Sequence, residues 1–140
     1  MRLVSYEENG RPRFGAIVGD VVLDLARASE AYAASDSSIL KIPSRIEHFF
    51  EDCGALSASA RTVIARFEAS PGATPGLSKP LADAKLLPPI QRPPKIVCVA
   101  RNYAEHAREA GLEISPIPIM FARFSRTLVA DGDPVLVPTV

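Results

Sequence analysis

A proline-rich passage in the middle of the sequence constrains the fold more than any other feature. Seven of the 13 prolines lie between Pro71 and Pro94, where fixed φ angles and missing amide donors favour extended backbone over helix. The passage therefore predicts a linker over residues 71–94. This linker divides the 140 residues into two parts, 1–70 and 95–140, and neither reaches the usual size of a domain.

The first part, residues 1–70, predicts a small α+β domain. Short apolar stretches alternate there with Asn9-Gly10 and Gly19-Asp20, which is the pattern of a three-stranded β-meander with tight turns. Helices are expected after the meander. Residues 26–34 form a helix-favouring stretch, and apolar residues recur at helical spacing over 46–50 and 57–69.

The second part opens with a strand that leads directly into a short helix. The apolar run over 96–99 predicts a strand that is covered on both faces. Asn102 is the expected N-cap, with Glu105 at the third helical position as in a capping box. Gly111 suits the first position after the helix. The helix is therefore expected to be short and bounded at both ends.

His106 and Glu109 are the strongest candidates for catalysis. They lie three residues apart on this helix and so project from one face. A carboxylate at that spacing can hold an imidazole by one ring nitrogen while the other nitrogen takes a proton, as a general base does. Without further context, the same spacing is also that of an ordinary surface pair.

Four side chains near this helix are candidates for binding a ligand. Arg101 and Asn102 lie at the junction of strand and helix, and Tyr103 could either donate to a ligand oxygen or pack against the helix. Arg123 ends a row of alternating apolar residues over 117–121, where a guanidinium suits a carboxylate. An arginine at the rim, paired within the protein itself, is the alternative for Arg123.

Three blocks of the second part resemble the start of the catalytic domain of the fumarylacetoacetate hydrolase family. They are Asn-Tyr-x-x-His-x-x-Glu over 102–109, Pro-Ile-Pro-Ile-Met-Phe-Ala-Arg over 116–123 and Asp-Gly-Asp-Pro-Val-Leu-Val-Pro over 131–138. Residues 1–70 resemble, more weakly, the small N-terminal domain of many bacterial members. The resemblance implies an α+β chain, in which this small domain precedes the first strands and the lid helix of a mixed β-roll that begins at residue 95.

The resemblance implies metal-dependent hydrolysis or lyase chemistry on a 2-oxo acid or a 1,3-diketone such as an acylpyruvate. Isomerases, decarboxylases and hydratases also occur in the family. A Mg, Mn or Ca ion would chelate the substrate and stabilise the departing enolate. His106 and Glu109 would activate water from a lid helix that orders when substrate binds. Arg101, Asn102 and Arg123 would contact the substrate, with Tyr103 beside them.

One departure from the family concerns the metal. The chain stops at Val140, before the Glu-x-Glu pair and the later Asp with which family members hold the ion. Asp131 and Asp133 are expected in a turn, so no metal ligand is assigned to this chain. Two alternatives therefore stay open. One is an inactive truncated fragment, and the other is an interaction module whose open strand edge at 135–137 pairs with a partner chain.

The composition narrows the partners and the compartment. The 16 basic and 16 acidic residues leave no net charge and form no long run of either sign, so a nucleic-acid footprint is not indicated. No apolar run approaches the roughly 18 residues of a membrane span, and the N-terminus lacks a signal pattern. The expected protein is cytoplasmic and binds a small molecule, without nucleic acid or membrane. By its resemblance to the family it would be a homodimer.

Overall fold

The computed structural model describes residues 1–113 and 116–139, which form two compact units. Met1–Ile90 and the described residues from Ala130 onward make the first unit, and Gln91–Val129 makes the second. Helices and strands occur together in the chain, and the first unit combines both in one core. The expected α+β class is confirmed.

The first unit is built on a five-stranded antiparallel sheet with the order β4-β3-β2-β1-β5. Its strands are β1 (Arg2–Glu8), β2 (Arg11–Val18), β3 (Val21–Asp24), β4 (Ser78–Pro80) and β5 (Lys85–Leu87). The first three form the expected meander.

Turn chemistry explains the two hairpins of the meander. Asn9 and Gly10 have φ of 52° and 73°, the two positive values that a type I′ turn needs. Gly19 has φ of 56° and Asp20 has no positive φ, which is the pattern of type II′. Both turns follow the right-handed twist of the strands that they join, and this fixes the strand register.

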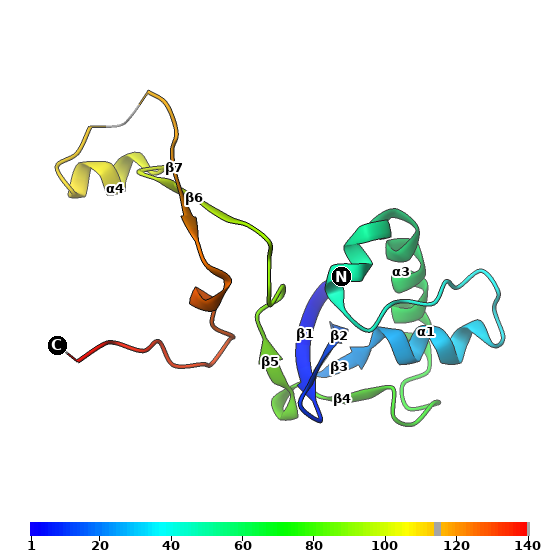
Figure 1. Ribbon diagram of the computed structural model, residues 1–140. Helices are drawn as coiled ribbons and strands as arrows, with labels where there is room; N and C mark the ends of the chain where they lie inside the picture. The colour runs from blue at the N-terminus through cyan, green and yellow to red at the C-terminus, as the bar shows by residue number, and fades with distance from the viewer. Residues whose placement is uncertain (114–115, 140) are drawn as a thin grey trace. The chain divides into compact units, whose positions relative to one another are not determined.

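Helices pack beside one face of this sheet (Figure 1). Asp24 accepts a hydrogen bond from the Arg27 amide at 2.9 Å and so caps the first helix. The helix predicted over 57–69 begins four residues earlier, because the preceding single turn runs into it without a break. The helical elements are α1 (Leu25–Ala33), α2 (Ile46–Phe49), the 3₁₀ turn η1 (Phe50–Asp52) and α3 (Cys53–Ala69).

The sheet is covered on both faces. Toward the helices, Phe14 and Leu23 are fully buried against Phe49 and Val63. On the opposite face lies a smaller cluster of Val4, Tyr6 and Val22, which Ile17, Leu81, Ala84 and Leu86 partly cover.

The proline-rich passage does more than link two parts. Residues 78–80 pair with β3 and residues 85–87 pair with β1, so the passage supplies both edge strands of the sheet. A 3₁₀ turn, η2 (Leu81–Asp83), joins them. The backbone is extended, as prolines favour, and Pro80 ends a three-residue edge strand, where its missing amide donor is tolerated.

The second unit is a two-stranded antiparallel ribbon with a short helix. Its elements are β6 (Ile96–Ala100), α4 (Ala104–Glu109), β7 (Ile119–Arg123) and the 3₁₀ turn η3 (Ser125–Thr127). The expectation that the strand at 96–99 is covered on both faces was wrong. Val97 and Val99 are 61% and 45% exposed, while Ile96 and Cys98 on the other face are half-buried. A continuous apolar run predicts burial only when a neighbouring layer is present to cover it.

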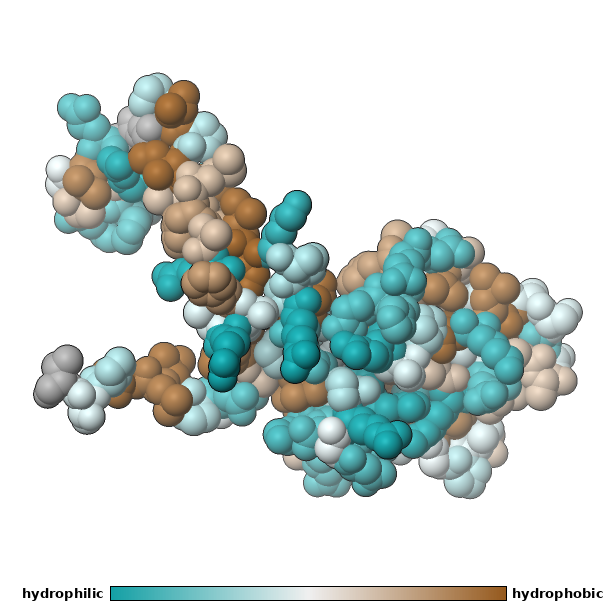
Figure 2. All heavy atoms as spheres, in the orientation of Figure 1, coloured by the Kyte–Doolittle hydropathy of each residue, from teal (hydrophilic) through white to brown (hydrophobic). Residues whose placement is uncertain are grey.

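The expected strand edge at 135–137 is also absent, since residues 133–139 contain no helix or strand. Val135, Leu136 and Val137 are exposed by 77% or more. Pro134 and Pro138 flank this apolar segment, and each lacks the amide donor that a ladder needs. Figure 2 shows hydrophobic side chains at the surface of this segment and of the ribbon.

We expect the 140-residue chain to self-associate through these apolar surfaces. Val97, Met120 and Phe124 are each more than 60% exposed, and apolar patches above a few hundred Å² usually drive association. Light scattering at increasing concentration should show species larger than a monomer, and Val97→Lys with Met120→Lys should reduce them. A single monomeric species with cooperative melting of residues 95–139 would contradict this expectation.

Candidate functional site

The junction between β6 and α4 is where most of the predicted site residues lie. Arg101 connects the two elements with φ of 53°, a left-handed conformation that non-glycine residues rarely adopt. Such a backbone costs on the order of 1 kcal/mol and occurs in turns and, repeatedly, at active sites. The Arg101 guanidinium donates a hydrogen bond to the Glu113 carbonyl at 3.3 Å. Backbone and side chain of Arg101 are therefore both held at this turn.

The helix begins one residue later than the sequence predicts. Tyr103, not Asn102, is the N-cap, and no side chain caps the helix. Tyr103 keeps an extended backbone, so Glu105 becomes the second helical position and cannot complete a capping box. The end of the helix is as predicted. Gly111 has φ of 64°, and its amide and that of Leu112 bond to the carbonyls of Arg108 and Ala107, a Schellman motif.

His106 and Glu109 both lie on the exposed side of α4, where only Ala107 is buried. Across residues 1–113 and 116–139, the structure forms no hydrogen bond or ion pair between their side chains. The carboxylate is close enough in sequence to orient the imidazole, but it does not do so in this conformation. Catalytic contacts of this kind often tighten only when substrate binds, so the roles of both residues stay predictions.

Arg101 and Asn102 line a pocket of about 200 Å³ at this junction. Val99 and Ala100 from β6 contribute to it, and residues 116–118 close the other side. The pocket thus combines apolar walls with one guanidinium and one side-chain amide, the mixture that small-molecule sites use. Tyr103, with its side chain 73% exposed, and His106 do not line it.

The structure does not bring Arg123 to this pocket. Arg123 pairs with Ile96 at one end of the ribbon, whereas Ala100 pairs with Ile119 at the other. Four residues of strand separate these ends, about 13 Å at 3.3 Å per residue. The guanidinium carbon of Arg123 lies 5.5 Å from the centre of the Phe121 ring, two residues away on the same face. A cation–π contact therefore accounts for its place in this conformation.

The described residues do not fit a divalent metal ion. Nowhere in residues 1–113 and 116–139 do three His, Cys, Asp or Glu side chains gather closely enough to hold one. Mg and Ca need about six oxygen ligands, of which a protein usually supplies several carboxylates. Asp133 instead accepts a hydrogen bond from the Ala130 amide at 3.3 Å, within a turn that Gly132 makes with φ of 81°. The predicted turn at Asp131 and Asp133 is present.

Sequence reasoning missed a buried polar network in the first unit. Asp24 is 2% exposed, and its Oδ2 accepts from the Tyr6 hydroxyl at 2.6 Å and from Arg13 Nε and Nη2 at 2.8 and 2.6 Å. A Cβ on Gly15 would lie 2.5 Å from the Leu23 carbonyl oxygen and 3.3 Å from the Tyr6 ring. Glycine therefore allows Tyr6 to reach Asp24 across β2. The only signal in the sequence was an Asp directly before a helix.

Tyr6 makes the first unit sensitive to alkaline pH. Burial, and then the neighbouring Asp24, raise the pKa of Tyr6 above its ordinary range. The folded state therefore keeps this proton at a pH where the unfolded chain, with a tyrosine pKa near 10, releases it. Stability should be complete below about pH 10 and fall above it, by up to about 1.4 kcal/mol per pH unit. Urea unfolding between pH 8 and about pH 11.5 measures this slope.

Tyr6→Phe removes the titrating group and should flatten that slope. Tyr103→Phe, at an exposed position, controls for loss of a hydroxyl. An unchanged slope in Tyr6→Phe would show that another group is responsible.

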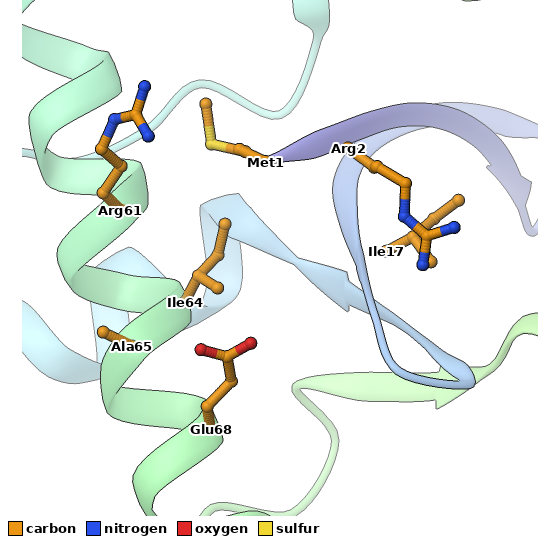
Figure 3. Close-up of a pocket in the computed structure, with 7 residues that line it drawn as sticks. All are labelled: Met1, Arg2, Ile17, Arg61, Ile64, Ala65 and Glu68. Carbon is orange, nitrogen blue, oxygen red and sulfur yellow. The ribbon is translucent and has the colours of Figure 1, made fainter.

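Figure 3 shows a different pocket, which lies in the first unit between α3 and the beginning of β1. Its volume is about 320 Å³, and its polar members Arg2, Arg61 and Glu68 are all exposed. Exposed charged side chains at a surface hollow are ordinary, so this pocket is a weaker candidate than the β6–α4 junction.

Comparison with known proteins points to one family. Residues 95–140 match the family described as fumarylacetoacetate (FAA) hydrolase C-terminal. Oxaloacetate tautomerase FAHD2A, mitochondrial, of Bos taurus is 37% identical over 59 residues, which are 42% of this chain and 19% of the relative. Oxaloacetate tautomerase fahd2, mitochondrial, of Xenopus laevis is 28% identical over 142 residues, 99% of this chain and 39% of the relative. A Dictyostelium discoideum fumarylacetoacetate hydrolase domain-containing protein 2 homolog is 37% identical over 59 residues. The chain thus spans well under half the length of these relatives.

The expectation of a cytoplasmic protein was wrong, because the bovine and frog relatives are mitochondrial. Charge balance and the lack of long apolar runs describe any protein in an aqueous compartment, so they do not separate the cytoplasm from an organelle. No helix in the described part of the chain is long and apolar enough to cross a membrane.

The match over residues 95–140 and the aligned relatives therefore show that this third of the chain is similar to the C-terminal domain of the fumarylacetoacetate hydrolase family, and they support a place for the chain in that family.

Proposed function

We propose that this chain supplies the acid–base and carboxylate-binding side chains of an enzyme that acts on a 2-oxo acid. The observation that carries the proposal is the pocket at the β6–α4 junction, because it lies within the residues that match the family and contains Arg101 and Asn102. In the relatives named oxaloacetate tautomerase, the substrate is a 2-oxo diacid. Tautomerisation, hydrolysis of an acylpyruvate and related lyase chemistry share one requirement, which is to move a proton while an enol or enolate is stabilised.

Charge supports an anionic substrate at the second unit. Gln91–Val129 contains six basic and three acidic residues, whereas the rest of the chain contains ten and thirteen. A local excess of positive charge raises the concentration of anions at the surface and favours their binding. The first unit has an excess of acidic residues. The positive charge is therefore a property of the second unit and not of the whole chain.

Each residue would have a defined role. The Arg101 guanidinium would bind a substrate carboxylate, and the Asn102 amide would donate to the neighbouring keto or enol oxygen. His106 would take the proton, with Glu109 orienting the imidazole once α4 closes as a lid. Tyr103, one turn before His106, could donate to a ligand oxygen. Arg123 would contribute only if the ribbon were rearranged in the complex, because it lies at the far end.

A divalent ion would supply charge stabilisation of the enolate in the family's chemistry. The described residues offer no group of ligands for it, so none of the roles above depends on it.

A specific observation also favours an interaction module as a second candidate. The apolar segment over 135–137 is exposed, contains no helix or strand, and has no strand partner among the described residues. Such a segment can add a strand to the sheet of another chain. In this case residues 95–139 would order only in the presence of that partner, and the isolated chain would catalyse nothing.

Kinetics on two proteins test the proposal. We expect residues 1–140 alone to give no metal-dependent tautomerisation of enol-oxaloacetate or hydrolysis of an acylpyruvate. A chimaera that joins residues 1–140 to the parts of the Xenopus laevis relative outside the aligned segment should be active with Mg and inactive after a chelator is added.

The outcomes separate the alternatives. Turnover by residues 1–140 alone, abolished by a chelator and restored by metal, would contradict the expected lack of a metal site. A folded chimaera that binds metal but accelerates neither reaction would contradict the proposed enzyme and leave the interaction module.

A further inference from the structure

Another pocket of the first unit, remote in sequence from the family motifs, gathers cationic side chains. It lies where β2, α1 and the segment after α1 meet, and its volume is about 420 Å³. The lining residues are Arg13, Ala26, Arg27, Glu30, Lys41, Ile42 and Ser44. Three cations and one acid line it, although the unit as a whole has more acidic than basic residues. We propose that this pocket binds a small dicarboxylate.

Two of the cations are already held in place. Arg13 uses Nε and Nη2 to bond Asp24, and Arg27 uses Nη1 and Nη2 to bond Glu8. Neither carboxylate lines this pocket. Both line a different pocket, to which Arg27 also contributes. Within the described residues, Nη1 of Arg13 and Nε of Arg27 have no acceptor. The two guanidinium groups can therefore donate further hydrogen bonds without losing their anchors, and their ordering costs little when a ligand binds.

The third cation, Lys41, makes only an exposed ion pair. Lys41 lies 3.5 Å from Glu30, and both side chains are more than 70% exposed. An exposed pair of this kind contributes little stability, so Lys41 can turn from Glu30 to a ligand at small cost. Glu30 is the only acid in the lining and opposes an anion there.

The shape of the pocket selects the ligand. Besides the charged side chains, its lining contains Ala26, the buried Ile42, which is 4% exposed, and Ser44. A pocket of this volume accommodates several carbon atoms rather than a bare inorganic ion. Three cations together with apolar Ala26 and Ile42 fit a short carbon chain with a carboxylate at each end. Because Asp24 and Glu8 already partly neutralise the two arginines, we expect modest affinity, with a dissociation constant on the order of 1 mM.

Titration of the ¹⁵N-labelled 140-residue chain with succinate tests the site by NMR, with sodium chloride at equal ionic strength as the reference. Saturable shifts are expected at the amides of Ala26, Glu30 and Ile42. Shifts that follow ionic strength alone, that saturate elsewhere, or that inorganic phosphate and acetate reproduce at the same concentration would overturn the dicarboxylate site.

A matched pair of variants distinguishes direct contact with the ligand from a general effect of positive charge on the protein surface. Arg27 and Arg45 are 43% and 44% exposed, and each pairs with a glutamate. Arg45 follows Ser44 in sequence but does not line the pocket. Arg27→Gln should lower the affinity for succinate about tenfold, which is the contribution of one charge-assisted hydrogen bond. Arg45→Gln should change that affinity less than twofold. Glu30→Gln should strengthen binding. Equal losses in Arg27→Gln and Arg45→Gln would overturn the proposal, as would weaker binding in Glu30→Gln.

Discussion

Replacing His106 with alanine in the active chimaera is expected to lower kcat by about 10²- to 10⁴-fold, the usual worth of a positioned general base. KM should change little, because His106 does not line the pocket that holds Arg101 and Asn102. Glu109→Gln should act in the same direction, since it keeps the shape of the side chain but removes the charge that stabilises the imidazolium. Steady-state kinetics with Mg in excess measure both variants.

The double variant and one control make this test specific. His106→Ala with Glu109→Gln should be no slower than the slower single variant, because the two residues would act as a unit. His48→Ala replaces the other histidine, which is exposed on α2, and should leave kcat unchanged. Near-normal kcat in His106→Ala would mean that α4 is only a lid and that the base lies elsewhere.

Local sequence signals predicted the elements whose structure depends on neighbouring residues. Asn9-Gly10 and Gly19-Asp20 set the hairpin turns through positive φ angles, and Gly111 set the end of α4 in the same way. Glycine or asparagine at a left-handed position has a local cause, so a single sequence is enough to find it. The start of α4 was predicted one residue too early. Arg101 adopts a left-handed backbone just before the helix, and an arginine gives no sequence signal for that conformation.

Long-range pairing explains why other parts of the fold were missed. Strands β4 and β5 have three residues each and no alternation of apolar and polar residues long enough to detect. Their strand character comes from pairing with β3 and β1, which lie more than 50 residues earlier in the sequence. The exposure of β6 has a similar cause, since burial depends on a layer that the strand's own sequence cannot specify.

The same reasoning applies to the candidate site. The sequence placed Arg101 and Asn102 together because they are adjacent, and in the structure both line one pocket, while their role in binding substrate stays a prediction. It also placed Arg123 with them, but antiparallel pairing puts Arg123 opposite Ile96, at the other end of the ribbon. The dicarboxylate pocket in the first unit was not predicted at all, because β2, α1 and the segment after α1 meet only in the folded chain.

Asp24→Ala is expected to destabilise the first unit by about 3–5 kcal/mol, the usual result of removing one partner from a buried charged pair. Three effects add in the same direction. The guanidinium of Arg13, which is 22% exposed, loses its carboxylate, the Tyr6 hydroxyl loses its acceptor, and α1 loses its N-cap. Native domains are stable by about 5–15 kcal/mol, so this variant would be close to unfolding at room temperature.

Two milder variants, each of which also removes a carboxylate, show whether burial of Asp24 is the cause of the large loss of stability. Glu8→Gln breaks the Arg27 ion pair, whose side chains are 43% and 23% exposed, and should cost less than about 1 kcal/mol. Asp24→Asn keeps an oxygen that can cap α1 or accept from Tyr6, but it removes the charge opposite Arg13, so its effect should lie between the other two. Urea unfolding followed by circular dichroism gives the three free energies. If Asp24→Ala cost no more than Glu8→Gln, the network would be a surface feature, and the stability of the first unit would depend on the apolar packing between its sheet and helices alone.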